Sequence, residues 1–207
     1  MGNFLAVDTS GSALIVIAKK DGKVFSTCLA NCSMKHSVLL MGAVEETLGK
    51  AGLALDECDF FSAVVGAGSF TGIRIGVSAT KGFALACKKP TLPVTSFDCL
   101  EYIDIEGKNL CLVDALHGYY YACGYENGEM TFAPAYVSEE EVLNLHAQGY
   151  ALRAFTQLEI ADKVPVRIMD GEKGFICAVE RLEARGAFDT LNPLYIRKSS
   201  AEESICK

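Results

Sequence analysis

Two features are missing from the sequence: a hydrophobic run long enough to cross a membrane and a leader for export. None of the apolar runs reaches the roughly 18 to 20 residues that a bilayer requires, and residues 1–8 contain no basic region followed by a cleavable apolar stretch. We therefore expect a cytoplasmic protein that has no membrane partner.

Clustered basic residues are missing as well. The chain has 26 acidic and 19 basic residues, which give a formal net charge of −7. A protein that held RNA by itself would need a concentrated basic stripe. If RNA is involved, we expect a partner to carry most of the binding. The basic residues include three pairs that lie far apart: Lys19 and Lys20, Lys88 and Lys89, and Arg197 and Lys198.

The cysteines do not form the pattern of a disulfide-stabilised protein. Nine are present, an odd number, and no export signal precedes them. Several lie in apolar segments that look like strands, among them Cys111, Cys123 and Cys177. We expect reduced cysteines that pack in the core as small hydrophobic residues.

One cysteine spacing could suit a metal ion, because Cys28, Cys32 and His36 would share a face of a continuous helix. Residues 24–30, however, have the pattern of a strand, and a fourth ligand for a closed zinc site is missing. We predict that no metal ion binds there.

The hydrophobic pattern predicts strands followed by helices. Half of the residues are apolar and 22% are charged, which is enough for one large core or two small ones. Asp21 and Gly22 form a turn pair that is typical of a two-residue hairpin. We expect strands at residues 3–7, 13–18, 24–30 and 60–65, a helix that begins near residue 33 and ends at Gly49 and Gly52, and a second helix at residues 70–87.

The opening pattern recurs 106 residues later. An apolar strand that ends at Asp8 has a counterpart that ends at Asp114, and the same offset places the Asp21 turn on Asn127 and Gly128. Ser138, followed by three glutamates, has the pattern of a helix start in the second copy. We therefore predict an α/β protein of two duplicated lobes, each a mixed sheet flanked by helices, with the first lobe at residues 1–104 and a reduced second lobe at residues 105–207.

This duplicated unit resembles the ribonuclease H-like, actin-like ATPase fold of sugar kinases, acetate kinases and heat-shock chaperone ATPases. In such proteins the acids at the strand ends face a cleft between the lobes and hold a metal ion and nucleotide phosphates. Asp8 and Asp114 are the matching positions in this chain. The resemblance implies a stand-alone ATP-dependent kinase or ATPase as one alternative for the function.

A glycine-rich turn, GAGSFTGIRIG at residues 66–76, lies between a predicted strand and a predicted helix. Its free N–H groups and hydroxyls could meet an anion, although Ile73 stands where a phosphate loop would carry lysine. The other interpretation is that the glycines allow close packing and that Ser69 caps the helix. The candidate nucleotide site consists of Asp8, Gly68, Ser69, Thr71, Gly72 and Asp114.

Five motifs spread through the chain resemble the bacterial TsaB family of tRNA threonylcarbamoyladenosine biosynthesis. They are FLAVDTS, GAGSFTGIRIG, LPVTS, LVDAL and PLYIRKSSAEE. The resemblance implies a two-lobed actin-like fold that has no catalytic activity of its own and binds a homologous catalytic subunit, TsaD. Together with the ATPase TsaE, that pair transfers threonylcarbamoyl from its adenylate to an adenosine beside the tRNA anticodon. The family is also classed with glycoproteases as non-peptidase homologues.

The residues of this chain agree with an inactive homologue. Catalytic relatives carry an H-x-x-x-H metal pair, and the matching positions here are Ser96 and Leu100, neither of which replaces a histidine ligand. We therefore predict no catalytic residues and no metal site. We also expect no tightly bound cofactor, while binding of ATP or ADP within the complex stays open.

The resemblance implies that helices of the first lobe form the contact with the catalytic subunit, which would be the only route to tRNA. Two helical stripes are the candidates, and a homodimer through the same stripes is a further hypothesis. The alternative is that these stripes simply cover the sheet. The candidate contact residues are Ser37, Leu40, Met41, Val44, Val77, Thr80, Lys81 and Ala84.

Overall fold

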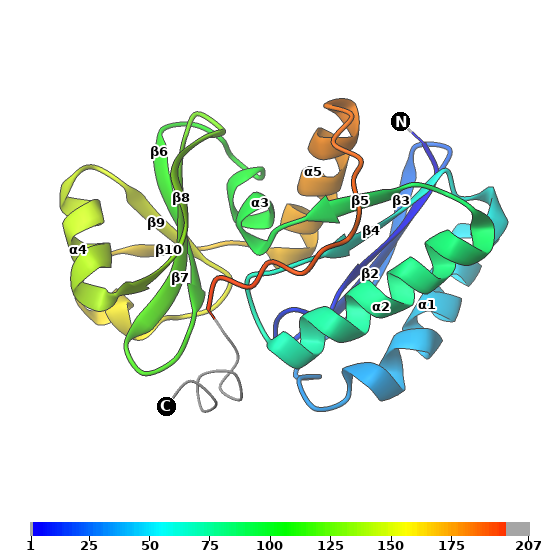
Figure 1. Cartoon of the computed structure of the whole chain (residues 1–207), viewed down its shortest axis with the longest axis horizontal. Coiled ribbons are helices and arrows are strands. Elements are labelled where there is room, and N and C mark those ends of the chain that lie inside the picture. Colours follow the sequence, from blue (N-terminus) through cyan, green and yellow to red (C-terminus); the bar gives the residue numbers. More distant parts are fainter. Residues whose placement is uncertain (1, 198–207) are drawn as a thin grey trace.

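The computed structural model describes residues 2–197 and folds them into two five-stranded sheets (Figure 1). The first sheet has the order β3-β2-β1-β4-β5, with β1 at Phe4–Asp8, β2 at Leu14–Lys20, β3 at Lys23–Leu29, β4 at Phe60–Val64 and β5 at Thr91–Val94. β1, β2 and β3 are antiparallel neighbours, whereas β1, β4 and β5 run parallel. Lys198 and the end of the PLYIRKSSAEE motif lie outside the described residues.

The second sheet repeats this arrangement. Its order is β10-β9-β6-β7-β8, with β6 at Lys108–Asp114, β7 at Tyr119–Glu126, β8 at Glu129–Ser138, β9 at Ala151–Ala154 and β10 at Val166–Ile168. β6 pairs antiparallel with β7 and parallel with β9, as β1 does with β2 and β4. The predicted α/β fold of two lobes is confirmed, because each strand of one sheet has a counterpart in the other.

The hairpin turns of the two sheets have nearly the same backbone conformation. φ is 50° at Asp21 and 80° at Gly22, and it is 52° at Asn127 and 81° at Gly128. Positive φ at both central residues fits the twist of a two-residue hairpin, and asparagine, aspartate and glycine tolerate it. The two hairpin turns are therefore equivalent and lie 106 residues apart, as predicted.

The helices differ between the lobes. α1 (His36–Ala51) and α4 (Glu139–Ala147) follow the third strand of each sheet, and Gly52 ends α1 in the left-handed conformation. Between the fourth and fifth strands, the first lobe has the 18-residue helix α2 (Phe70–Cys87), as predicted, whereas the second lobe has only a four-residue turn, η2 (Glu159–Asp162). The remaining elements are η1 (Leu55–Glu57), α3 (Ser96–Glu101) and α5 (Gly171–Ala184).

The first sheet lies between α1 and α2 on one face and α5 on the other (Figure 1). Phe175 and Val179 of α5 pack with Phe4 of β1, although α5 follows the last strand of the second sheet. α3, which precedes the second sheet, packs Leu100 against that sheet. Helices therefore cross between the lobes, and the division between residues 104 and 105 stays a prediction.

The cysteines of the described region are all free thiols, and five of them are buried. Cys111 and Cys123 lie opposite each other on the paired strands β6 and β7, as their apolar surroundings predicted. The strand expected at Cys177 is wrong, since this residue lies on α5. Among residues 2–197 there is no helix both long and apolar enough to span a bilayer.

Candidate functional site

A cavity of about 560 Å³ is lined by residues from both lobes. The ends of the central strands β1 and β6 contribute Asp8 and Asp114, and the loop before α2 contributes Gly68 and Ser69. Two further acids, Asp170 and Glu172, come from the start of α5. The structure thus brings together four of the six candidate nucleotide residues, while Thr71 and Gly72 are not among the lining residues of this cavity.

The two strand-end acids form the same local turn in different surroundings. Oδ1 of Asp8 accepts a hydrogen bond from the N–H of Ser10 at 2.7 Å, and Oδ1 of Asp114 accepts one from the N–H of Leu116 at 2.8 Å. Burial raises the pKa of the Asp8 carboxyl above its usual range, against the opposing effect of the Ser10 hydrogen bonds. Asp114 is exposed.

The glycine-rich turn positions the start of α2 against the β1–β2 loop. Ser69 caps α2 through its Oγ, which accepts a hydrogen bond from the N–H of Gly72 at 3.2 Å. A Cβ added at Gly72 would collide with the carbonyl oxygen of Thr9, and the Thr9 hydroxyl donates to the Gly72 carbonyl at 2.6 Å. Gly72 is therefore buried against Thr9 and turned away from the cavity, while Thr71 is exposed.

The cavity is acidic. Its described lining residues include four carboxylates and no lysine, arginine or histidine. Two of these acids already have structural partners, because Asp170 caps α5 through the N–H of Lys173 and Glu172 accepts a hydrogen bond from the Ser26 hydroxyl at 2.6 Å. These carboxylates would repel a polyphosphate that entered the cavity without a cation.

The positions that match the relatives' metal pair hold structural residues. The Ser96 hydroxyl is buried and donates to the carbonyl of Ala67 at 2.6 Å, and Leu100 lies in the core. Of the earlier cysteine candidates, Cys28 lies on β3, whereas Cys32 lies in the loop before α1. Within residues 2–197, no group of three or more histidine, cysteine or acidic side chains could hold a metal ion.

The candidate contact residues divide by burial. Ser37, Met41 and Lys81 are exposed on α1 and α2. The other five are buried in the chain itself, and their predicted role as contacts stays a prediction; they are Leu40, Val44, Val77, Thr80 and Ala84. Their burial agrees with the alternative that the stripes cover the sheet.

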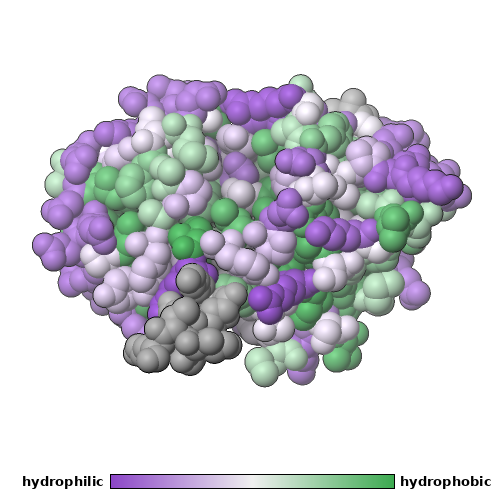
Figure 2. Space-filling model, in the orientation of Figure 1, coloured by the Kyte–Doolittle hydropathy of each residue, from purple (hydrophilic) through white to green (hydrophobic). Residues whose placement is uncertain are grey.

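Sequence reasoning missed the most exposed apolar residues of this region. Met34 is 94% exposed, Val38 79% and Leu85 81%, beside Met41 at 50%. Met34, Val38 and Met41 recur at a spacing of four and three residues, a helical signal that was present in the sequence. Figure 2 shows apolar surface among polar surface on the side of the molecule where α1 and α2 lie in Figure 1.

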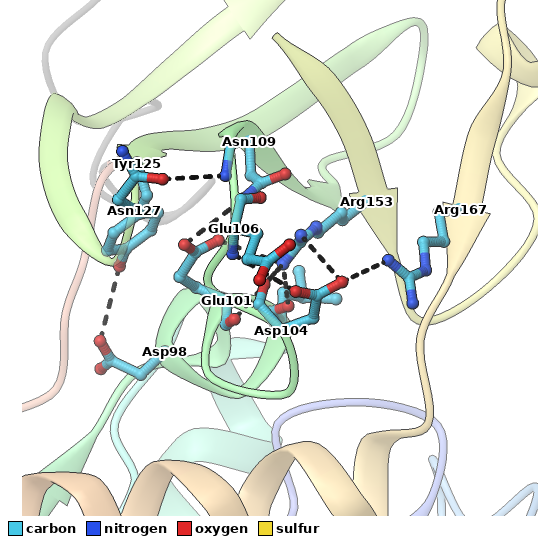
Figure 3. A network of polar contacts seen from close by, with 11 residues as sticks. Asp98, Glu101, Asp104, Glu106, Asn109, Tyr125, Asn127, Arg153 and Arg167 are labelled. Carbon is cyan, nitrogen blue, oxygen red and sulfur yellow. Dashed lines mark hydrogen bonds and ion pairs between the residues drawn. The ribbon is translucent and has the colours of Figure 1, made fainter.

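A buried ionic network joins α3 to the second sheet (Figure 3). Arg153 of β9, only 3% exposed, contacts the fully buried carboxylate of Glu101 at 3.3 Å and donates to the backbone carbonyls of Leu100, Glu101 and Asp104. Arg167 donates to the Asp104 carboxylate at 2.8 Å. Burial raises the pKa of Glu101 to about 7, although Arg153 opposes this. No sequence pattern pointed to this network.

This chain is similar to proteins that are named for tRNA modification. The family model described as "TsaD: tRNA N6-adenosine threonylcarbamoyltransferase" matches residues 30–200. The tRNA threonylcarbamoyladenosine biosynthesis protein TsaB of Escherichia coli (strain K12) is 32% identical over 92 residues, which are 44% of this chain and 39% of that protein. TsaB of Bacillus subtilis (strain 168) is 31% identical over 96 residues, 46% of this chain and 42% of that protein. The chain thus spans about two fifths of the length of these curated relatives.

Two solved structures from Pseudomonas aeruginosa have the same fold. One, an uncharacterised protein with similarity to the peptidase YeaZ, superposes with a TM-score of 0.79 at 24% identity and covers 95% of this chain and 100% of its own. The other, YeaZ, gives a TM-score of 0.75 at 24% identity over 94% of this chain and all of its own. At this identity the likeness establishes the fold.

Proposed function

The chain belongs to the family of the tRNA N6-adenosine threonylcarbamoyltransferase TsaD and is a TsaB-like member of it. On this premise we propose that it is a non-catalytic subunit of the machinery that synthesises threonylcarbamoyladenosine in tRNA. Its role is to bind and support the homologous catalytic subunit, TsaD. The ATPase TsaE acts with this pair, and tRNA is reached only through the complex. If ATP or ADP binds, it binds within the complex. When TsaD is absent, the chain forms a homodimer through the same surface.

The observation that carries the proposal is the exposed apolar surface of the first lobe. Met34, Val38 and Met41 lie along α1 and the loop before it, and Leu85 lies near the end of α2. Large side chains of this kind, gathered on neighbouring elements, are typical of a surface that another protein covers. α1 and α2 therefore supply the contact, with Ser37, Met41 and Lys81 in it.

The chemistry of the cleft supports a binding role over an enzymatic one. Ser96 and Leu100 occupy the positions of the relatives' metal pair, and the Ser96 hydroxyl is already donated to Ala67. Asp8 and Asp114 face an acidic cavity in which no described side chain would neutralise a phosphate. A stand-alone kinase or ATPase has no such support from these residues.

The test combines purified chain with purified TsaD from the same organism and measures complex formation by size-exclusion chromatography and modified adenosine by mass spectrometry. We expect a stable complex, and modification that requires this chain. Met41→Asp and Lys81→Glu should weaken both readouts. Met130→Asp, at a residue that is 55% exposed in the second lobe, is the matched control and should change neither.

Measurement of ATP turnover distinguishes the proposed role from the competing function, a stand-alone ATP-dependent kinase or ATPase. We expect the isolated chain to hydrolyse no ATP above the level of its Asp8→Asn variant and to show no thermal stabilisation by ATP. An unchanged complex in both interface variants, or robust turnover that Asp8→Asn abolishes, would refute the proposed role.

A further inference from the structure

A groove of about 360 Å³ runs along the C-terminal half of α2, outside the cleft between the lobes. Lys81, Leu85 and Lys88 line it from α2 and its cap, and Lys89 follows directly. Its other wall includes Leu191, which is fully buried where the C-terminal segment packs against the first lobe. Figure 2 shows hydrophobic surface bordered by hydrophilic surface over this end of α2.

The three lysines of the groove, Lys81, Lys88 and Lys89, have no ion-pair partner in the part of the chain that the structure describes. None of their ammonium groups forms an ion pair with a residue in the 2–197 range, whereas Lys20, Lys50 and Lys163 all do. No carboxylate is among the described residues that line the groove. Asp189 directly precedes Thr190 of the groove wall, and its Oδ1 accepts a hydrogen bond from the N–H of Thr190 at 2.6 Å.

The groove is positively charged, whereas the whole chain is acidic, with a formal net charge of −7. Like charges held along one side of a helix repel each other and weaken the helix slightly. Their repulsion is removed when acidic groups of another molecule lie between them. The charge of the groove is therefore complementary to a negatively charged ligand.

The middle of the groove is apolar. Leu85 lies between Lys81 and Lys88 on the helix, at spacings of four and three residues, and its side chain is 81% exposed. A ligand that supplied only phosphates would leave this leucine in water, whereas a peptide that carries an apolar side chain between acids would cover it. The combination favours a protein segment over an RNA backbone.

We propose that this groove binds an acidic segment of a partner protein, with an apolar side chain of that segment packed on Leu85 and its carboxylates paired with Lys81, Lys88 and Lys89. Pairs between lysine and carboxylate become stronger as the leucine contact excludes water from them. The site goes beyond the proposed function, because it requires only this chain and an acidic apolar peptide.

The experiment measures fluorescence anisotropy of a labelled nonapeptide in which glutamates alternate with leucines. Two control peptides replace all glutamates by glutamine or all leucines by serine, and a single-stranded RNA of equal net charge is the fourth probe. We expect the first peptide to bind at least about tenfold more tightly than each of the other three, which corresponds to about 1.4 kcal/mol.

Variants locate the binding. Lys88→Asn combined with Lys89→Gln, and separately Leu85→Asp, should each weaken the peptide about tenfold. All three residues are at the surface or at the helix end, and asparagine tolerates the positive φ of 53° at position 88. The matched control, Lys23→Gln with Lys173→Gln, removes the same charge elsewhere and should bind the peptide normally.

Equal binding of the glutamine peptide, equal loss in the control variant, or preference for the RNA would overturn the proposal. Circular dichroism and thermal melting verify that each variant is folded. Lys81 and Leu85 belong to both the groove and the proposed TsaD contact, whereas Lys88 and Lys89 belong to the groove alone. Because the peptide assay contains no TsaD and the lysine variant changes only Lys88 and Lys89, its failure is distinguishable from a failure of the proposed function.

Discussion

The two lobes have the same sheet and different helices. Each sheet has three antiparallel strands followed by two parallel ones, yet 18 residues of α2 in the first lobe correspond to four residues of η2 in the second. The exposed Leu85 and the three groove lysines all lie on α2 or at its end. The comparison teaches that the repeat conserves the sheet, while the long helix α2 and the exposed side chains on it belong to the first lobe alone among the described residues.

The lobes also differ at their equivalent acids. Asp8 and Asp114 end matching strands and form matching turns, but Asp8 is partly buried whereas Asp114 is exposed. Burial raises the pKa of Asp8. Burial disfavours the charged form of Asp8, and none of the described residues that line the cavity is basic.

The largest expected effect concerns the junction of the two lobes. Arg153→Met should destabilise the protein by about 3–5 kcal/mol, because the buried Glu101 carboxylate loses its cation and several backbone carbonyls lose their donor. Urea unfolding measures this loss. Adding Glu101→Met to the same variant should restore much of the stability. A single variant as stable as the double one would show that this pair does not join α3 to the second sheet.

The next effect tests why α2 begins where it does. Gly72→Ala should cost about 2–3 kcal/mol, since its Cβ would collide with the backbone oxygen of Thr9. Gly82→Ala, on the same helix with open space around it, should instead stabilise by about 0.5–1 kcal/mol. Thermal melting of both variants gives the comparison. Equal changes would contradict the close packing of α2 on the first sheet.

A third prediction concerns pH. Glu101 has a folded-state pKa of about 7, raised from 4.5, so the folded protein binds more protons than the unfolded chain between these values. The stability contributed by neutral Glu101 is therefore complete below pH 4.5 and is lost as the pH rises through 7, by roughly 3 kcal/mol. Asp104, Arg153 and Arg167 are the charged neighbours.

Glu101→Gln should flatten this part of the stability profile, measured by urea unfolding at intervals from about pH 4.5 to about pH 8. The matched control is Glu106→Gln, a nearby exposed acid, which should keep the wild-type slope. An unchanged slope in the Glu101→Gln variant would assign the pH dependence to another group.

The smallest effect compares the equivalent acids directly. Asp8→Asn should stabilise the protein by about 0.5–1 kcal/mol at pH 7, because it removes a partly buried charge and keeps an oxygen for the Ser10 N–H. Asp114→Asn, at an exposed site, should stay within about 0.5 kcal/mol of the wild type. A destabilised Asp8→Asn variant would indicate that the first-lobe carboxylate has a structural role that its counterpart lacks.

The sequence predicted the sheets well because their signals are local. The hairpin at Asp21 and its copy at Asn127 are specified by turn residues, and the strand pattern between them repeats at a fixed offset. The start of α4 at Ser138 follows from a capping residue and the acid three positions later. Such features require no knowledge of the rest of the chain.

The exposed faces of α1 and α2 could not be predicted in the same way. Leu40 and Met41 are both apolar and adjacent, yet one is buried and the other exposed, and only packing against the sheet decides between them. The contact between Gly72 and Thr9 joins residues 63 positions apart, so the pattern of glycines alone could not predict it. The Arg153 and Glu101 pair joins residues 52 positions apart and leaves no local trace.

Hydrogen–deuterium exchange on the chain mixed with TsaD tests the central claim most directly. We predict that the amides of α1 and α2 become protected on complex formation, while those of α4 and the second sheet exchange as in the free chain. Protection confined to the second lobe, or no protection anywhere, would contradict the assignment of the first-lobe helices as the docking surface.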